Sequence, residues 1–273
     1  MTRDRVTRDG VTRHGGRGVV LVDRVDGVAL VTLNRPEARN ALDVELLRAL
    51  PAAMTELDAD DEVAVVILTG ADPAFCAGLD LKELGSSGDN LSGGGKGVAA
   101  TPFPADMSKP VIGAVNGPTV TGGLELALHC DFLIASELAR FGDTHARVGV
   151  VPGWGLSVLL PQAVGVRRAK EMSLTGRFLT AQEARACGLV NHVVPHDQLL
   201  PAARALATDI VGADQDAARA LLAEYKQTSA TTVTDGLEIE ARLFRDWSRR
   251  KFDPDAVERR RQAIVERGRS QAT

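Results

Sequence analysis

Short apolar runs separated by turn residues fill the first two thirds of the chain, and they predict strands. Residues 19–33 read VVLVDRV and VALVTL around Asp26-Gly27, which is typical of a hairpin because Asp-Gly fits a tight turn between β-branched runs. Residues 63–70 and 111–117 are apolar at almost every position, which predicts strands buried on both faces of a sheet. Two further strands are predicted at 131–136 and 189–194.

Helical periodicity lies between these strands and takes over after them. Residues 42–57 have the spacing of an amphipathic helix, which Pro51 is expected to bend or restart. The run GGLELALHC, 122–130, is apolar nearly all round and predicts a buried helix. Thr180 and Glu183 have the spacing of a capping box that opens a short helix. The apolar face of the first helix consists of Leu42, Leu46, Leu50, Met54 and Leu57.

This order of elements predicts an α/β protein in three parts. Residues 1–17 are polar and are expected to form a flexible tail, and 18–197 hold the alternating strands and helices. Residues 198–273 have a helical pattern only, and they are expected to form an oligomerisation region. Within the core, the Gly- and Ser-rich segment 84–106 predicts a mobile loop.

The composition narrows the classes of partner. Of the 273 residues, 44% are hydrophobic and 25% charged, and the net charge of -4 is the opposite of the basic balance of nucleic-acid binders. No apolar run reaches the roughly 18 residues that a membrane span needs, and the polar N-terminus lacks the apolar core of a signal peptide. The three cysteines show no paired spacing, which indicates a reducing compartment. We therefore expect a cytoplasmic protein without a nucleic-acid or membrane partner.

Several motifs that are typical of other chemistries are incomplete or absent in the sequence. The glycines of SGGGKG, 92–97, have neither the GxGxxG spacing nor the Ser/Thr that follows the lysine of a phosphate-binding loop. No GxSxG sequence is present, which argues against a serine hydrolase of that type. His192 and His196 have the spacing of two metal ligands on one helix, but Pro195 between them argues against such a helix. No metal and no bound cofactor are expected.

The run AVNGPTVTGGLELALHCD, 114–131, carries the most chemical information. Gly122 and Gly123 open a helix after a buried strand, and the first amides of a helix are unsatisfied and attract negative charge. Glu125 lies inside this apolar helix, where an unpaired carboxylate costs several kcal/mol. Either Glu125 compensates the helix dipole, or it works as a general acid or base beside an anion-binding turn. A capping box is the weaker alternative, because its spacing from Thr121 falls on Leu124.

A second turn, in FCAGLDLKEL at 75–84, offers another candidate amide or is a plain strand-to-helix connection. Together with LNRPEARNAL, ILTGADPAFCAGLDLKEL, FGDTHARVGVVPGWG and LTGRFLTAQEARACGLVNHVVP, these runs resemble the crotonase superfamily, the enoyl-CoA hydratase/isomerase family, in order and spacing. The resemblance covers nearly the whole chain after the tail. It implies a spiral of strand-strand-helix units, an acyl-CoA thioester substrate that brings its own coenzyme A, and an oxyanion hole made of the backbone amides of Leu79 and Gly122.

One position departs from the pattern of the hydratases. In those enzymes two glutamates share the water, and the first matches Glu125. The second position, twenty residues on, holds His145. An imidazole accepts or donates a proton near neutral pH, so Glu125 and His145 are the expected catalytic pair, and Asp143 is near enough in sequence to orient the ring.

The resemblance also implies a set of substrate-binding residues. Trp154, where many relatives have a small residue, either narrows the acyl pocket or belongs to the core. Arg35 and Lys82 either meet the phosphates or adenosine of coenzyme A or are solvated surface charges. The full set of expected contacts is Ala77, Asp80, Lys82, Arg35 and Trp154.

The leading hypothesis is therefore an enoyl-CoA hydratase, a hydro-lyase that works through an enolate held in the oxyanion hole. The alternatives are an isomerase, a decarboxylase or a thioesterase of the same superfamily, and a non-catalytic acyl-CoA-binding protein. Retention of the costly buried Glu125 argues against the last of these. A homotrimer or a dimer of trimers is expected, because Leu199, Leu200, Leu206 and Ile210 form an apolar face that needs covering.

Overall fold

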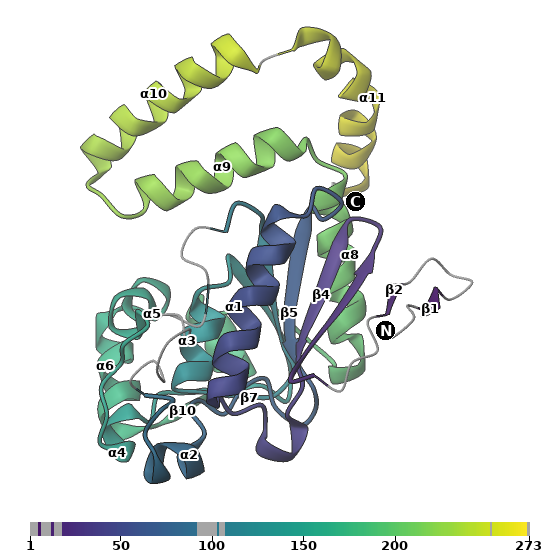
Figure 1. Cartoon of the computed structure of the whole chain (residues 1–273). Helices are drawn as coiled ribbons and strands as arrows, with labels where there is room; N and C mark the ends of the chain where they lie inside the picture. The colour runs from purple at the N-terminus through teal and green to yellow at the C-terminus, as the bar shows by residue number, and fades with distance from the viewer. Residues whose placement is uncertain are drawn as a thin grey trace. The chain divides into compact units, whose positions relative to one another are not determined.

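The computed structural model describes residues 5–6, 12–13, 18–91, 103, 107–251 and 253–271 (Figure 1). It divides into two compact units, Met1–Arg219 and Ala220–Thr273. Most of the predicted tail and much of the predicted mobile loop, 92–102 and 104–106, lie outside the described residues. In the tail, two strands of two residues are described, and they pair with each other and with the sheet of the first unit.

A sheet of eight strands, in the order β1-β2-β3-β4-β5-β6-β8-β11, is the centre of the first unit. Its strands from β4 onward run parallel, whereas those from β1 to β4 pair antiparallel. The predicted hairpin is confirmed, because Asp26 and Gly27 both have the positive φ that a two-residue hairpin turn requires. The strands span Arg5–Val6, Thr12–Arg13, Val20–Val25, Val28–Leu33, Val65–Gly70, Val111–Val115, Phe132–Ser136 and His192–Val194.

A second sheet of three short strands, in the order β10-β9-β7, was not predicted. Each of its strands has three residues, which is too short for an alternating pattern to show in the sequence. The strands span Pro118–Val120 (β7), Arg140–Gly142 (β9) and Phe178–Thr180 (β10). A strand of the large sheet, a strand of the small sheet and a helix follow one another twice, as β6-β7-α3 and β8-β9-α4, which agrees with the predicted strand-strand-helix units.

Helices cover both faces of the large sheet. On one face α1 packs Leu46, Leu50, Met54 and Leu57 of its predicted apolar stripe against alternate residues of the strands, and Pro51 lies within the helix without interrupting it. Leu42, the first residue of the predicted stripe, lies before the helix and pairs with Leu79 instead. On the other face α8 packs against the remaining residues of β4, β5, β6 and β8. The helices of the first unit span Val44–Ala59 (α1), Leu81–Ser86 (α2), Gly122–Leu128 (α3), His145–Val148 (α4), Leu156–Val164 (α5), Val166–Thr175 (α6), Ala181–Ala186 (α7) and Leu199–Val211 (α8). Two short 3-10 helices span Pro36–Ala38 (η1) and His196–Gln198 (η2).

The apolar face of α8 is covered within its own chain. Leu199 is buried against the sheet of the same chain, and Leu200, Leu206 and Ile210 pack beside it. The inference that these residues need a partner subunit to cover them is therefore wrong, and it does not support an oligomer. The predicted capping box of α7 is confirmed, since the side chains of Thr180 and Glu183 bond reciprocally to the backbone.

The C-terminal region is helical, as predicted. Helix α9, Gln215–Thr228, begins in the first unit, and α10, Val233–Arg250, and α11, Pro254–Gln271, belong to the second. Thr232 caps α10, because its side chain accepts a hydrogen bond from the backbone of Asp235.

Candidate active site

The two turns that the sequence singled out lie side by side. The chain from Phe75 to Leu79 runs next to Leu42 and to strand β7, which leads into α3. At Gly123 this approach is so close that a Cβ atom would lie 2.1 Å from the carbonyl oxygen of Cys76. Glycine is required there because any side chain would separate α3 from the neighbouring turn. Thr121, just before the helix, has a φ of 48°, a backbone conformation that non-glycine residues rarely adopt.

The two residues of the predicted oxyanion hole line the same cavity. Leu79 and Gly122 line one pocket, and no described residue accepts a hydrogen bond from the backbone N–H of either. Gly122 is the first residue of α3, a position whose N–H has no partner within the helix. The structure therefore places two free amide donors together, as an oxyanion hole requires.

Two buried asparagines hold the turn that leads to Leu79. The side-chain nitrogen of Asn40 donates to the carbonyl oxygens of Ala71 and Ala74, at 2.8 and 2.7 Å. The amide of Asn116 donates to Asp72 at 2.9 Å and to Ala74 at 3.2 Å. These roles were not recognised in the sequence, because the contacts span more than thirty residues.

Glu125 is held by backbone amides of another segment. Its carboxylate, of which 1% is exposed, accepts through Oε1 from the backbone N–H of Trp154 at 2.8 Å and of Leu156 at 3.3 Å. These donors lie at the start of α5, where the helix dipole also favours a negative charge. Burial nevertheless outweighs these bonds and raises the pKa of Glu125 above its usual value. Glu125 is therefore a carboxyl group that takes up a proton more readily than one in water.

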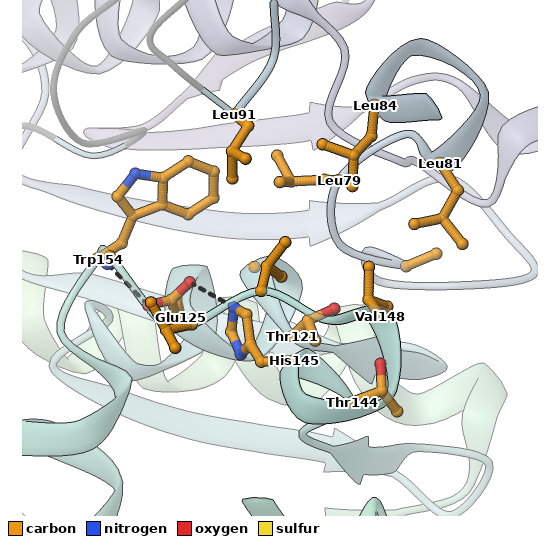
Figure 2. A pocket seen from close by; sticks show the side chains of 15 residues that line it. Leu79, Leu81, Leu84, Leu91, Thr121, Glu125, Thr144, His145, Val148 and Trp154 are labelled. Carbon is orange, nitrogen blue, oxygen red and sulfur yellow. Dashed lines mark hydrogen bonds and ion pairs between the residues drawn. The ribbon is translucent and has the colours of Figure 1, made fainter. Parts of the chain in front are cut away.

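The structure brings the predicted catalytic pair together (Figure 2). Nε2 of His145 lies 3.6 Å from Oε2 of Glu125, and both residues line the pocket. On the other side of the ring, Nδ1 of His145 lies 2.6 Å from Oδ1 of Asp143, which is fully buried. Burial opposes the charge of Asp143, but the hydrogen bonds from the ring and the backbone N–H of His145 help to outweigh it, and the pKa of Asp143 is lowered. The arrangement is a chain of three titratable side chains that ends at the cavity.

The walls of the cavity are mostly apolar, and the empty space in the cavity and at its mouth is about 630 Å³, part of which is open solvent. Figure 2 shows the indole of Trp154 on one side of the pocket and Leu81, Leu84 and Val148 on the other. The indole also lies against the oxyanion turn, since a Cβ atom on Gly122 would come within 2.9 Å of its ring. Trp154 thus lines the pocket and packs against the core at once. The complete lining is Ala77, Leu79, Leu81, Leu84, Leu91, Thr121, Gly122, Glu125, Thr144, His145, Val148, Val150, Val151, Gly153 and Trp154.

Three of the expected substrate contacts lie outside this lining. Arg35 forms ion pairs with Asp80 at 3.0 Å and with Asp43 at 3.1 Å. Asp80 also caps α2, because its side chain accepts from the backbone of Lys82 at 3.0 Å, and the side chain of Lys82 itself is exposed. The structure gives Arg35 and Asp80 a role in joining α2 to the neighbouring turn. Contacts of Arg35, Asp80 and Lys82 with a substrate remain a prediction, whereas Ala77 and Trp154 do line the pocket.

The residues that the structure describes contain no group of three or more His, Cys, Asp or Glu that could hold a metal ion. In the same part of the chain, no helix is both long enough and apolar enough to cross a membrane.

Comparison with known proteins agrees with this geometry. A family model described as enoyl-CoA hydratase/isomerase matches residues 23–271. A probable enoyl-CoA hydratase of Mycobacterium tuberculosis is 40% identical over 232 residues, which cover 82% of this chain and 88% of that protein. The crystal structure of an enoyl-CoA hydratase from Mycobacterium smegmatis is 55% identical, with a TM-score of 0.71 over 85% of this chain and 98% of that one. An enoyl-CoA hydratase from Bacillus anthracis is 34% identical and matches with a TM-score of 0.82 over 91% and 96% of the two chains.

Proposed function

The chain belongs to the enoyl-CoA hydratase/isomerase family, and we propose that it adds water to the double bond of a 2-enoyl-CoA with Glu125 and His145 as the proton-transfer pair. The resemblance to the crotonase superfamily is thus confirmed, and an enoyl-CoA hydratase-like hydro-lyase is the activity that the relatives support. The observation that carries the proposal is the approach of Oε2 of Glu125 and Nε2 of His145 to 3.6 Å beside two free amides.

The geometry suits a single water molecule. A separation of 3.6 Å is too long for a direct hydrogen bond, but one water can lie within hydrogen-bond distance of both atoms. The water oxygen forms a bond to Cβ of the substrate, and the electrons of the double bond move onto the thioester oxygen. The amides of Leu79 and Gly122 stabilise the negative charge there, and losing one such donor costs about 100- to 1000-fold in rate.

Two proton transfers complete the addition. One member of the pair takes a proton from the water, and the other gives a proton to Cα as the enolate collapses. One proton then passes between Nε2 and Oε2, so the pair regains its starting state and the substrate has gained one hydrogen and one hydroxyl. Because Glu125 takes up a proton readily and an imidazole exchanges protons near neutral pH, the two groups are able to hold one proton between them.

A panel of acyl-CoA thioesters, with products identified by mass spectrometry, tests this function. We expect a 2-enoyl-CoA to gain the mass of one water. Conversion of a 3-enoyl-CoA to its 2-enoyl isomer without hydration would instead assign an isomerase. Loss of carbon dioxide from a carboxyacyl-CoA would assign a decarboxylase, and release of free coenzyme A a thioesterase. Binding of the thioesters without any conversion would indicate a non-catalytic binding protein.

The same proposal includes the setting in which the enzyme works. Coenzyme A arrives only as part of the substrate, and no metal takes part. The enzyme acts in the cytoplasm, as a homotrimer or a dimer of trimers.

A further inference from the structure

We propose that Asp143 is the positioning residue of the catalytic pair: it fixes the tautomer and the ring orientation of His145, so that Nε2 is the atom that exchanges protons. This inference rests on the proposed function, because it concerns the same pair of groups.

One oxygen atom of Asp143 anchors His145 twice. Oδ1 lies 2.6 Å from Nδ1 of the ring and also accepts from the backbone N–H of His145 at 3.1 Å. Asp143 follows directly after strand β9, Arg140–Gly142, so its backbone is fixed by the small sheet. The imidazole is thereby tied to the backbone of its own helix turn, and its rotation about the side-chain bonds is restricted.

The bond to Asp143 also decides which ring nitrogen carries the hydrogen. A carboxylate can only accept hydrogen bonds, and the contacts of Asp143 keep it ionised. Nδ1 must therefore be the donor, and Nε2 of the neutral ring has a free lone pair that faces Glu125. The same logic applies to Glu125, whose Oε1 is occupied by two amide donors and whose Oε2 alone remains free for proton exchange.

Only a histidine at position 145 needs the hydrogen bond that Asp143 accepts from Nδ1. The two oxygens of a carboxylate are chemically equivalent, whereas the two nitrogens of a neutral imidazole are a donor and an acceptor. A histidine at position 145 thus requires an acceptor on Nδ1, and a buried anion supplies it. The negative charge of Asp143 also stabilises the imidazolium that forms when Nε2 holds a proton.

Nuclear magnetic resonance of the histidine ring nitrogens tests the proposal on the protein without substrate. The His145 signals are identified by their loss in His145→Gln. In the natural protein we expect the neutral ring to carry its hydrogen on Nδ1. In Asp143→Ala we expect a mixture of both tautomers, because the acceptor of the Nδ1 hydrogen is gone.

Kinetics supply the second readout. In Asp143→Ala we expect kcat for a short 2-enoyl-CoA to fall about 100- to 10,000-fold, while KM changes less than about threefold. Asp131→Asn is the matched control, since Asp131 also accepts a backbone N–H, from Val111, but does not line the pocket. It should leave the tautomer of His145 and kcat unchanged.

If Asp143→Ala does not fold, Asp143→Leu keeps a similar shape and removes both acceptor oxygens, so the tautomer of His145 still tests the proposal. An unchanged tautomer of His145 in the folded variant, or an unchanged kcat, would overturn the proposal. The resonance experiment needs no turnover. A natural protein that hydrates no enoyl-CoA but shows an Asp143-dependent tautomer would refute the proposed function and leave the positioning role intact.

Discussion

At the scale of single residues, the site is defined by a histidine where related hydratases are expected to have a second glutamate. A histidine at this position is still able to transfer protons, but the groups that contact its ring differ from those that a carboxylate needs. His145 is bounded by Asp143 on one ring nitrogen and by Glu125 on the other.

Replacing the imidazole of His145 should remove proton transfer at this position with little effect on substrate binding. We expect His145→Ala to lower kcat by about 100-fold or more with KM nearly unchanged, since the group acts on the reacting atoms. Glu125→Gln should be at least as damaging, and His145→Glu should retain hydration because it restores two carboxyl groups. Steady-state kinetics on a short 2-enoyl-CoA measure these effects, and His192→Ala, at an exposed histidine, is the control. Full turnover in His145→Ala would show that His145 is a bystander.

The raised pKa of Glu125 predicts a pH-dependent gain in stability for Glu125→Gln. The folded protein disfavours the charged form of Glu125, so the natural protein loses stability as the pH rises from the unfolded value of 4.5 through the raised folded value. Glutamine stays neutral and escapes this loss. Urea denaturation from about pH 4.5 to 8 should therefore show the free energy of unfolding of Glu125→Gln rising relative to that of the natural protein. A difference that does not vary with pH would mean that the folded state leaves this carboxyl unperturbed.

The candidate residues could be predicted from the sequence where a local motif places them. Glu125 is recognisable as a carboxylate inside an apolar helix, whereas the roles of Leu79 and Gly122 follow from the resemblance of their runs to the crotonase superfamily. The backbone amides of Trp154 and Leu156 that bind Glu125 lie about thirty residues away in the sequence, and no local pattern predicts their contact with Glu125. The ion pair of Arg35 with Asp80 was not predicted for the same reason, because it joins segments 45 residues apart.

At the scale of elements, the site depends on how closely α3 approaches the turn before Leu79. Gly123→Ala should destabilise the protein by about 3 kcal/mol or more, because a Cβ atom would lie 2.1 Å from backbone at Cys76. Gly85→Ala is the matched control, since a Cβ atom there meets nothing within 4 Å and alanine favours the helix. Thermal and urea denaturation measure both variants. Equal stability of Gly123→Ala and the natural protein would show that the two segments separate without cost.

The loop that carries Trp154 should limit the length of the acyl group. The indole lies on the pocket wall beside the oxyanion turn, so Trp154→Ala enlarges the space next to the reacting carbons. We expect kcat/KM for long 2-enoyl-CoA substrates to rise relative to short ones by about tenfold or more, since each additional buried CH₂ contributes about 0.8 kcal/mol. Val166→Ala, at an exposed position outside the pocket, serves as the control. An unchanged order of preference across chain lengths would assign the indole to the core alone.

The sequence predicted long or strongly patterned elements and missed short ones. The hairpin, the two buried central strands and helix α1 each have a pattern of five or more residues, so hydrophobic period and turn chemistry suffice. The three-residue strands of the small sheet exist only because neighbouring strands pair with them. Helix α4 has four residues, too few for a period of 3.6 to show.

At the scale of the whole molecule, the oligomeric state remains a prediction, and the exposed residues on which it rests differ from those that the sequence indicated. The apolar face of α8 is covered within the chain, so it gives no reason for a partner. Other apolar side chains of the first unit are largely exposed, among them Leu174 at 77% and Val158 at 60%. Since such groups favour burial between subunits, we expect a homotrimer or a dimer of trimers in light scattering at micromolar concentration. A stable monomer would contradict this expectation.

The central claim is that Glu125 and His145 together add water to an enoyl-CoA. The most direct test is the incubation of the natural protein and of Glu125→Gln with a short 2-enoyl-CoA in water enriched in oxygen-18. Mass spectrometry of the product should show one labelled oxygen, incorporated by the natural protein at a rate at least 100-fold above that of the variant. A natural protein that incorporates no label while it binds the thioester, or a variant that incorporates label equally fast, would contradict the account.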